Sequence, residues 1–294
     1  MSQLFNILFP VFILIFIGYL YARWRQADMV VVNRINLEVF IPALLIDVLA
    51  QKNFDIYSYR WIALACLLAT LLSGVIAWLI GRGLKLTPTM FIPSMMFNNS
   101  ANMGLPLAVL AFGEPALGAA VILFLVSTLL HSTIGLLIVG GRVSWWKLLI
   151  MPFNLAIIIG LTISFMQWQI PAVIHQPISM LGQIAIPLML VSLGVRMVDA
   201  DLSLWRIGLL GALARPFIGV IAAIVALFFI PLDAIQKAQF LLFSALPPAV
   251  LNYMFAEKYS QQPTEVASMV ILGNALSIVT LSLMLFYLKS MGQL

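Results

Sequence analysis

Three asparagines, a glycine and a proline lie close together in the first half of the chain, inside a long apolar segment. They stand in the run Asn98-Asn99-Ser100-Ala101-Asn102-Met103-Gly104-Leu105-Pro106. Asparagine side chains both donate and accept hydrogen bonds, whereas glycine and proline interrupt helices. The downstream half of an interrupted helix begins with free N–H groups, and their partial positive charge suits an anion. The run therefore predicts a site that binds the carboxylate of a small acid without a full cation.

A second interruption is expected in the other half of the chain, from Ser244 to Asn252, where two prolines are adjacent. Paired interruptions in corresponding halves mark the substrate site of many secondary transporters. The alternative is a pair of proline kinks whose asparagines bond neighbouring helices. The three clustered asparagines favour a binding site. Its predicted residues are Asn98, Asn99, Asn102, Gly104, Pro106, Pro247, Pro248 and Asn252.

The elements that position these residues are membrane-spanning helices. Of the 294 residues, 63% are hydrophobic and 9% are charged. This composition is far from that of soluble globular proteins. Apolar stretches of about 20 residues, long enough to span a bilayer, recur along the whole chain. We therefore predict an all-α polytopic membrane protein with ten spans. The spans are expected at 4–22, 30–50, 60–81, 89–111, 115–139, 146–166, 175–196, 204–230, 234–256 and 263–288.

The basic residues set the expected orientation, because lysine and arginine favour the cytoplasmic side. With the N-terminus outside, ten of the 15 basic residues are cytoplasmic, four are outside and Arg215 lies within a span. Both termini are therefore expected on the non-cytoplasmic side of the plasma membrane, the inner membrane of a bacterial cell. The cytoplasmic set is Arg23, Arg25, Arg34, Arg82, Lys85, Arg142, Lys147, Arg196, Arg206 and Lys258, and the outer set is Lys52, Arg60, Lys237 and Lys289.

The two halves of the sequence repeat one another. Ile41-Pro42 recurs as Ile186-Pro187, and Gly74-Val75-Ile76-Ala77 recurs as Gly219-Val220-Ile221-Ala222, both 145 residues later. The repeats are 1–141 and 142–294. Because five spans per repeat is an odd number, the second copy enters the membrane from the opposite side. We therefore predict an inverted repeat in which helices 4 and 9 are broken.

Ionisable residues within spans are candidates for coupling or gating, because a charge there is costly. Arg215 is near mid-depth of its span, where it could attract the substrate anion or pair with Glu38 or Asp47. Glu38 could instead form a salt bridge with Arg34, one helical turn away. Asp47 could reach water at the outer end of its span. If transport is coupled to protons, Glu38 and Asp47 are the candidates.

Several classes of site are not expected. Cys66 is the single cysteine, and His131 and His175 have no ligand partner at helical spacing, so no metal site is predicted. No nucleophile with a base, phosphate loop or dinucleotide motif is present, so we expect neither an enzyme nor a bound cofactor. The basic residues are scattered between spans rather than clustered, which argues against nucleic acid. The expected partners are a small organic acid and the lipid bilayer.

The sequence resembles the auxin efflux carriers, whose bacterial members include proteins assigned as malate and malonate permeases. The resemblance spans nearly the whole chain. It is carried by Asn102-Met103-Gly104-Leu105-Pro106-Leu107, Pro42 after Asn36, Ile186-Pro187-Leu188-Met189-Leu190-Val191-Ser192-Leu193-Gly194 and Pro247-Pro248. It implies a fold similar to the bile-acid sodium symporters, with helices 4 and 9 crossing at their breaks. It further implies a dimer formed through a scaffold of helices 1, 2, 6 and 7, with helices 3–5 and 8–10 as a moving transport unit.

Two departures from the family limit what the resemblance implies. Only Gly140 to Trp145 joins the halves, so the long cytoplasmic loop of the plant carriers is absent. No acid lies between Trp61 and Ile80, where plant carriers have a proton-linked aspartate, so coupling to H⁺ or to Na⁺ is open. A carrier for a small carboxylate is the leading hypothesis. A passive organic-anion channel and an intramembrane enzyme or sensor are the alternatives.

Overall fold

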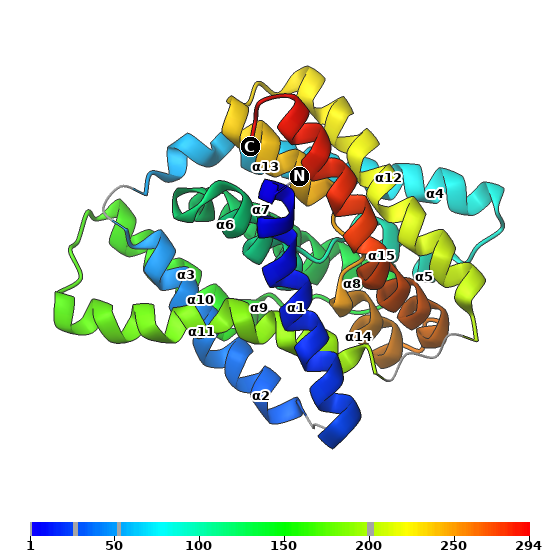
Figure 1. The fold of residues 1–294 in the computed structure, drawn as a ribbon, viewed down its shortest axis with the longest axis horizontal. Helices are drawn as coiled ribbons and strands as arrows, with labels where there is room; N and C mark the ends of the chain where they lie inside the picture. The colour runs from blue at the N-terminus through cyan, green and yellow to red at the C-terminus, as the bar shows by residue number, and fades with distance from the viewer. Residues whose placement is uncertain (1, 26–28, 52–53, 199–202) are drawn as a thin grey trace.

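The fold is a bundle of helices. The computed structural model describes residues 2–25, 29–51, 54–198 and 203–294 (Figure 1). Within these ranges the only β-type pairing is one isolated bridge, between Asn98 and Pro248. Lys52, which was counted for the orientation, lies outside the described residues.

Among the described residues, six helices are long and apolar enough to cross a membrane. They run over Leu4–Arg25, Ile56–Gly83, Glu114–Ile138, Ala172–Arg196, Trp205–Phe229 and Pro263–Ser290. Large apolar side chains such as Val173 and Phe228 are more than 80% exposed on the outside of the bundle. Lipid can cover such surfaces, since helices satisfy their backbone hydrogen bonds internally. The chain is therefore an all-helical, multi-pass membrane protein, as the composition predicts.

The elements of the first half begin and end as follows: α1 (Ser2–Arg25), α2 (Val30–Ile35), the π-helical turn η1 (Asn36–Phe40), α3 (Ile41–Leu49), η2 (Ile56–Tyr59), α4 (Arg60–Gly83), α5 (Pro88–Met96), the π-helical turn η3 (Ser100–Gly104), α6 (Leu105–Phe112), η4 (Glu114–Ala116), α7 (Leu117–Leu130), η5 (His131–Gly135) and α8 (Leu136–Ile138). The second half contains α9 (Trp145–Leu149), α10 (Pro152–Phe165), α11 (Ala172–Arg196), α12 (Trp205–Phe229), α13 (Ala234–Ser244), α14 (Val250–Lys258) and α15 (Pro263–Ser290).

Each of the ten ranges expected to span the membrane contains helix, but five of these ranges are interrupted, one of them, 115–139, by the π-helical turn η5. The range 30–50 passes through η1, and 146–166 is divided between α9 and α10. The ranges 89–111 and 234–256 are broken near their middles, after Met96 and after Ser244. These last two interruptions fall where the asparagine and proline runs predict them.

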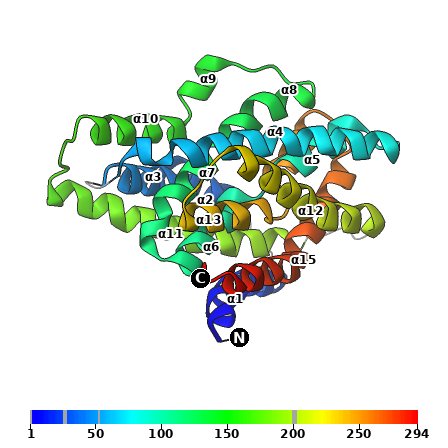
Figure 2. The same cartoon turned by 90° about the horizontal axis from the view of Figure 1, so that it is seen from above.

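The helices pack in two groups (Figures 1 and 2). α1, α3, α10 and α11 pack against one another, while α4, α5 and α12–α15 form the other group. α6 and α7 lie between the groups: α6 contacts α1 and α11, and α7 contacts both α3 and α4. Glycines permit the closest crossing, because a Cβ at Gly194 of α11 would meet the backbone oxygen of Ile15 in α1.

Candidate functional site

The two interruptions lie side by side and are joined through their backbones. Phe97 and Asn98 are extended, and Asn98 pairs with Pro248 in an antiparallel bridge. The N–H of Asn99 donates to Pro247 O at 2.9 Å, and the N–H of Ala249 donates to Phe97 O at 3.1 Å. Proline has no N–H group, so the helix cannot continue through the adjacent prolines. The carbonyls freed by each break therefore find donors in the other.

Asparagine side chains reinforce this pairing in both directions. Asn98 Nδ2 donates to Phe243 O at 2.7 Å, at the carboxyl end of α13. Asn252 Nδ2 donates to Phe97 O at 3.3 Å, just beyond the carboxyl end of α5. Each break thus supplies a side-chain amide to a carbonyl at the carboxyl end of the opposite half-helix, where the regular N–H donors of a helix are missing.

A third asparagine joins both breaks to α15. Asn99 Nδ2 donates to Asn274 Oδ1 at 2.7 Å, and Asn274 Nδ2 donates to Pro248 O at 3.2 Å. Asn99 and Asn274 are each at most 3% exposed. This network is therefore a buried structural link, because polar groups in an apolar interior must be paired.

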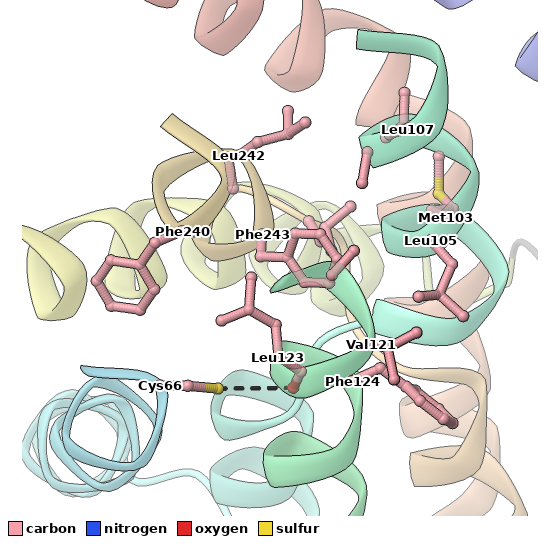
Figure 3. Packing of buried hydrophobic residues seen from close by; sticks show 14 of the residues in the cluster. Cys66, Met103, Leu105, Leu107, Val121, Leu123, Phe124, Phe240, Leu242 and Phe243 are labelled. Atoms are coloured by element: carbon pink, nitrogen blue, oxygen red, sulfur yellow. Dashed lines mark hydrogen bonds between the residues drawn. The ribbon is translucent and has the colours of Figure 1, made fainter. Parts of the chain in front are cut away.

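Apolar packing fixes the depth of the two breaks relative to one another. Figure 3 shows the ring of Phe243 directed toward the chain that carries Met103, Leu105 and Leu107. Gly104 makes room for this ring, since a Cβ there would lie 2.7 Å from Phe243 Cε1. The close approach that Gly104 allows is thus to Phe243. Pro106 is buried in the first turn of α6, where proline needs no N–H partner.

A cavity of about 360 Å³ opens beside the paired breaks. Ser100, Ala101 and Asn102, at the start of η3, line it from one break, and Ala249, Val250 and Leu251, at the start of α14, line it from the other. The first N–H groups of a helix have no acceptor within that helix and carry partial positive charge. Two positive helix ends therefore face one cavity. This volume is in the range of small-molecule sites.

The rest of the lining comes from both helix groups, and nine of its 19 residues are apolar. It comprises Asn33, Asn36, Leu37, Ile41, Asn98, Asn99, Phe124, Ser127, Thr128, His131, Ser132, Met151, Phe153, Met189, Ser192, Leu193, Arg196, Met254 and Phe255. Arg196, in the last turn of α11, is the one charged residue among the described lining residues. A cavity whose exposed surface is mainly apolar, with polar side chains placed within it, is typical of a site for a small organic molecule.

Several polar atoms at this cavity have no hydrogen-bond partner in the part of the protein that the structure describes. Asn36 Oδ1, Ser192 Oγ and His131 Nε2 are buried without a hydrogen bond. Among the described residues, the side chain of the half-buried Asn102 also forms no hydrogen bond, in contrast to the side chains of Asn98 and Asn99. Buried polar groups are ordinarily satisfied, so these atoms are candidates for contact with a ligand or with water.

His131 is held as an aromatic packing residue at the edge of the cavity. Its ring stacks on Phe97 with centroids 4.1 Å apart and meets the edge of Phe255 at 5.2 Å. The side chain of Asn252 lies beside it, although neither His131 Nε2 nor Asn252 Oδ1 has a well-formed hydrogen bond. Within the described residues there is no cluster of three metal-ligating side chains around it or elsewhere.

Arg215 lies outside this cavity. It is 3% exposed, and its Nη1 donates to Ser244 O at 3.2 Å, at the carboxyl end of α13. A cation is favourable at the negative end of a helix dipole. Arg215 also lines a second cavity of about 30 Å³, together with Asn98 and Ser127. Arg215 thus holds the second break, and it pairs with neither Glu38 nor Asp47.

Neither of the two acids proposed for coupling lines the cavity. Glu38 is exposed in η1, and no ion pair with Arg34 is present in the part of the chain that is described. Asp47 is near the end of α3, with its carboxylate 2.9 Å from His175 Nε2. The Asp47 side chain therefore has a partner within the protein, where the sequence predicted contact with water.

Of the eight predicted binding residues, Asn98, Asn99 and Asn102 line the cavity. Gly104, Pro106, Pro247, Pro248 and Asn252 do not, but they build or hold the breaks that shape it. Sequence reasoning missed Asn33, Asn36, Ser192 and Arg196 as lining residues. Their spacing carried a signal: each pair stands three or four residues apart and so shares a helix face.

The fold and the cavity together define a membrane protein built around paired helix interruptions. The family described as membrane transport protein matches residues 4–142 and 138–285. The chain therefore belongs to this membrane transport family, that of the auxin efflux carriers. The resemblance seen in the sequence is confirmed, and the class of protein is a membrane transporter. The comparison with curated proteins gave no match.

Proposed function

We propose that the protein is a secondary transporter that moves a small organic acid by alternating access. The observation that carries this proposal is the cavity lined by the amino ends of both half-helices, η3 with α6 and α14. Their partial positive charges converge on a space of about 360 Å³, where a carboxylate can accept hydrogen bonds from backbone N–H groups. Asn102 is the side chain most available to join them.

We propose the ten-span inverted repeat as the architecture behind this site. Residues 1–141 and 142–294 are the repeats, and helices 4 and 9 cross at the breaks. Support comes from the two interruptions, which lie in corresponding positions and hydrogen-bond to one another. Rocking or sliding of one helix group against the other would then expose the cavity to each side in turn.

The packing of the helices supports the division into two moving parts. α1–α3 and α9–α11 form the proposed scaffold, which we expect to dimerise in the plasma membrane. α4–α8 and α12–α15 form the proposed transport unit, which contains both breaks and Arg215. The cavity lies between these parts, because Asn36 and Ser192 belong to one and Asn99 and Phe255 to the other.

We infer that the structure represents the inward-facing state. The exposed lining residues are Leu37, Met151 and Met254. Each belongs to a segment end that the distribution of basic residues assigns to the cytoplasm. With both termini outside, the open end of the cavity faces the cell interior.

Counterflow in liposomes tests the carrier. Vesicles preloaded with an unlabelled acid should accumulate the same acid, labelled, and the uptake should saturate. Unsaturable conductance in a planar bilayer would support the alternative, a passive organic-anion channel. Imposing first a pH gradient and then a sodium gradient on the same vesicles tests H⁺ and Na⁺ coupling. Loss of pH-driven uptake in Glu38→Gln or Asp47→Asn would assign the coupling to that acid.

A further inference from the structure

The wall of the cavity formed by α11 and η1 carries polar groups that the protein itself leaves unpaired. Arg196 and Ser192 are one helical turn apart on α11, so both point to the same side of that helix. Asn36 is in η1, which packs against α11. All three residues line the cavity.

Two of these side chains are nearly fully buried yet lack hydrogen bonds. Asn36 is 4% exposed and Ser192 is 5% exposed, and neither Asn36 Oδ1 nor Ser192 Oγ has a hydrogen-bond partner among the residues that the structure describes. A buried polar atom without a hydrogen bond is unfavourable by about 1–3 kcal/mol. Both residues line the cavity of about 360 Å³, so a ligand or its hydration shell is the available partner.

Arg196 supplies the charge on this wall. It is half-buried and forms no ion pair with any described residue. It is also the one charged side chain among the described residues of the lining. A guanidinium group binds a carboxylate through two parallel hydrogen bonds, and such charge-assisted bonds are about twice as strong as neutral ones.

We propose that Arg196, Ser192 and Asn36 form a carboxylate-binding subsite on the scaffold wall, separate from the helix ends at the breaks. This inference rests on the proposed transport function and sharpens it. An acid with two acceptor groups is held between two walls. One group faces the start of η3 and α14, and the other faces Arg196. The acid thereby links the two helix groups that must move past each other.

The test compares succinate with its monoamide, succinamate, by binding to the purified protein. The two probes differ in one charged group. Wild-type protein should bind succinate about tenfold or more tightly than succinamate, the order expected for a charge-assisted hydrogen bond. Arg196→Gln should remove this preference by weakening succinate alone. Arg196→Lys should retain part of it, since the charge remains while the planar fork is lost.

The matched control is Arg206→Gln. Arg206 is exposed at the start of α12 and does not line the cavity, so its loss changes the net charge equally but should leave the preference intact. An undiminished preference in Arg196→Gln, equal binding of the two probes by wild type, or no binding of either would overturn the subsite. Saturable counterflow of a monocarboxylate that depends on Asn102 would meanwhile preserve the proposed function. If the wild-type protein showed no counterflow of any acid, both the subsite and the proposed transport function would be overturned.

Discussion

The two helix breaks differ in what they contribute. The first, after Met96, presents Asn98, Asn99 and Asn102 to the cavity. The second, after Ser244, lines the cavity with the apolar residues Ala249, Val250 and Leu251. Its prolines lack N–H groups, but Pro247 O accepts from the Asn99 N–H of the first break. One copy of a repeated element thus carries the polar side chains of the site, while the other is held by its partner and supplies chiefly a helix end.

The two breaks also differ in how closely the neighbouring glycine-containing helices pack against them. Gly74 in α4 and Gly219 in α12 occupy equivalent positions in the sequence repeat. A Cβ at Gly74 would lie 2.9 Å from Sδ of Met96, the flexible side chain that ends α5. A Cβ at Gly219 would meet the backbone oxygen of Ser244 and the guanidinium of Arg215. The second break is therefore the more rigidly enclosed.

Gly219→Ala should give the largest effect, because a backbone atom cannot rotate away as a side chain can. We expect the free energy of unfolding to fall by about 3 kcal/mol, which is in the upper part of the range for overpacking. The thermal unfolding midpoint in detergent should fall with it. Gly74→Ala is the matched control and should lose less, since the Met96 side chain can change rotamer. Equal losses in the two variants would contradict the asymmetry.

Asn274→Ala should have the next largest effect. It leaves the Asn99 amide and Pro248 O without their partners, which destabilises by about 2 kcal/mol. Asn99→Ala and the double variant complete a cycle, measured by thermal unfolding. A coupling of at least about 0.5 kcal/mol is expected for residues in contact, whereas additive losses would show that the two asparagines act independently.

Asn102→Ala should separate binding from folding. Because the Asn102 side chain forms no hydrogen bond within the described structure, the free energy of unfolding should stay within about 0.5 kcal/mol of the wild type. The half-saturating acid concentration in the counterflow assay should rise about tenfold, near 1.4 kcal/mol. Unchanged counterflow would remove Asn102 from the site, and a large stability loss would place it with Asn99 among the structural asparagines.

Ser127→Ala should give the smallest effect. Its hydroxyl lies 3.5 Å from Asn98 Oδ1, at the limit of a hydrogen bond. Asn98 keeps its donation to Phe243 O, so we expect a stability change below about 0.5 kcal/mol. Thermal unfolding of Ser127→Ala and of Asn98→Ala, measured under the same conditions, compares the two losses of stability. A loss as large as that of Asn98→Ala would mean that the hydroxyl, rather than the amide, holds the first break.

The positions of the breaks were predictable because they depend on local chemistry. Proline removes a donor wherever it stands, and clustered asparagines are unfavourable in an apolar helix unless they are paired. The run that begins at Asn98 and the adjacent prolines Pro247 and Pro248 therefore predicted both interruptions. Arg196 was not predicted, since an arginine at the end of an apolar helix has the ordinary role of marking the cytoplasmic side.

The sequence by itself determined that the chain is a helical membrane protein of the auxin efflux carrier family, because composition, span length and the asparagine and proline runs act locally. Only the tertiary structure decided which asparagines are available to a ligand. Asn98, Asn99, Asn102 and Asn252 are chemically identical, and hydrogen bonds to residues far along the chain occupy the amides of all but Asn102. Such long-range partners depend on how the helices pack.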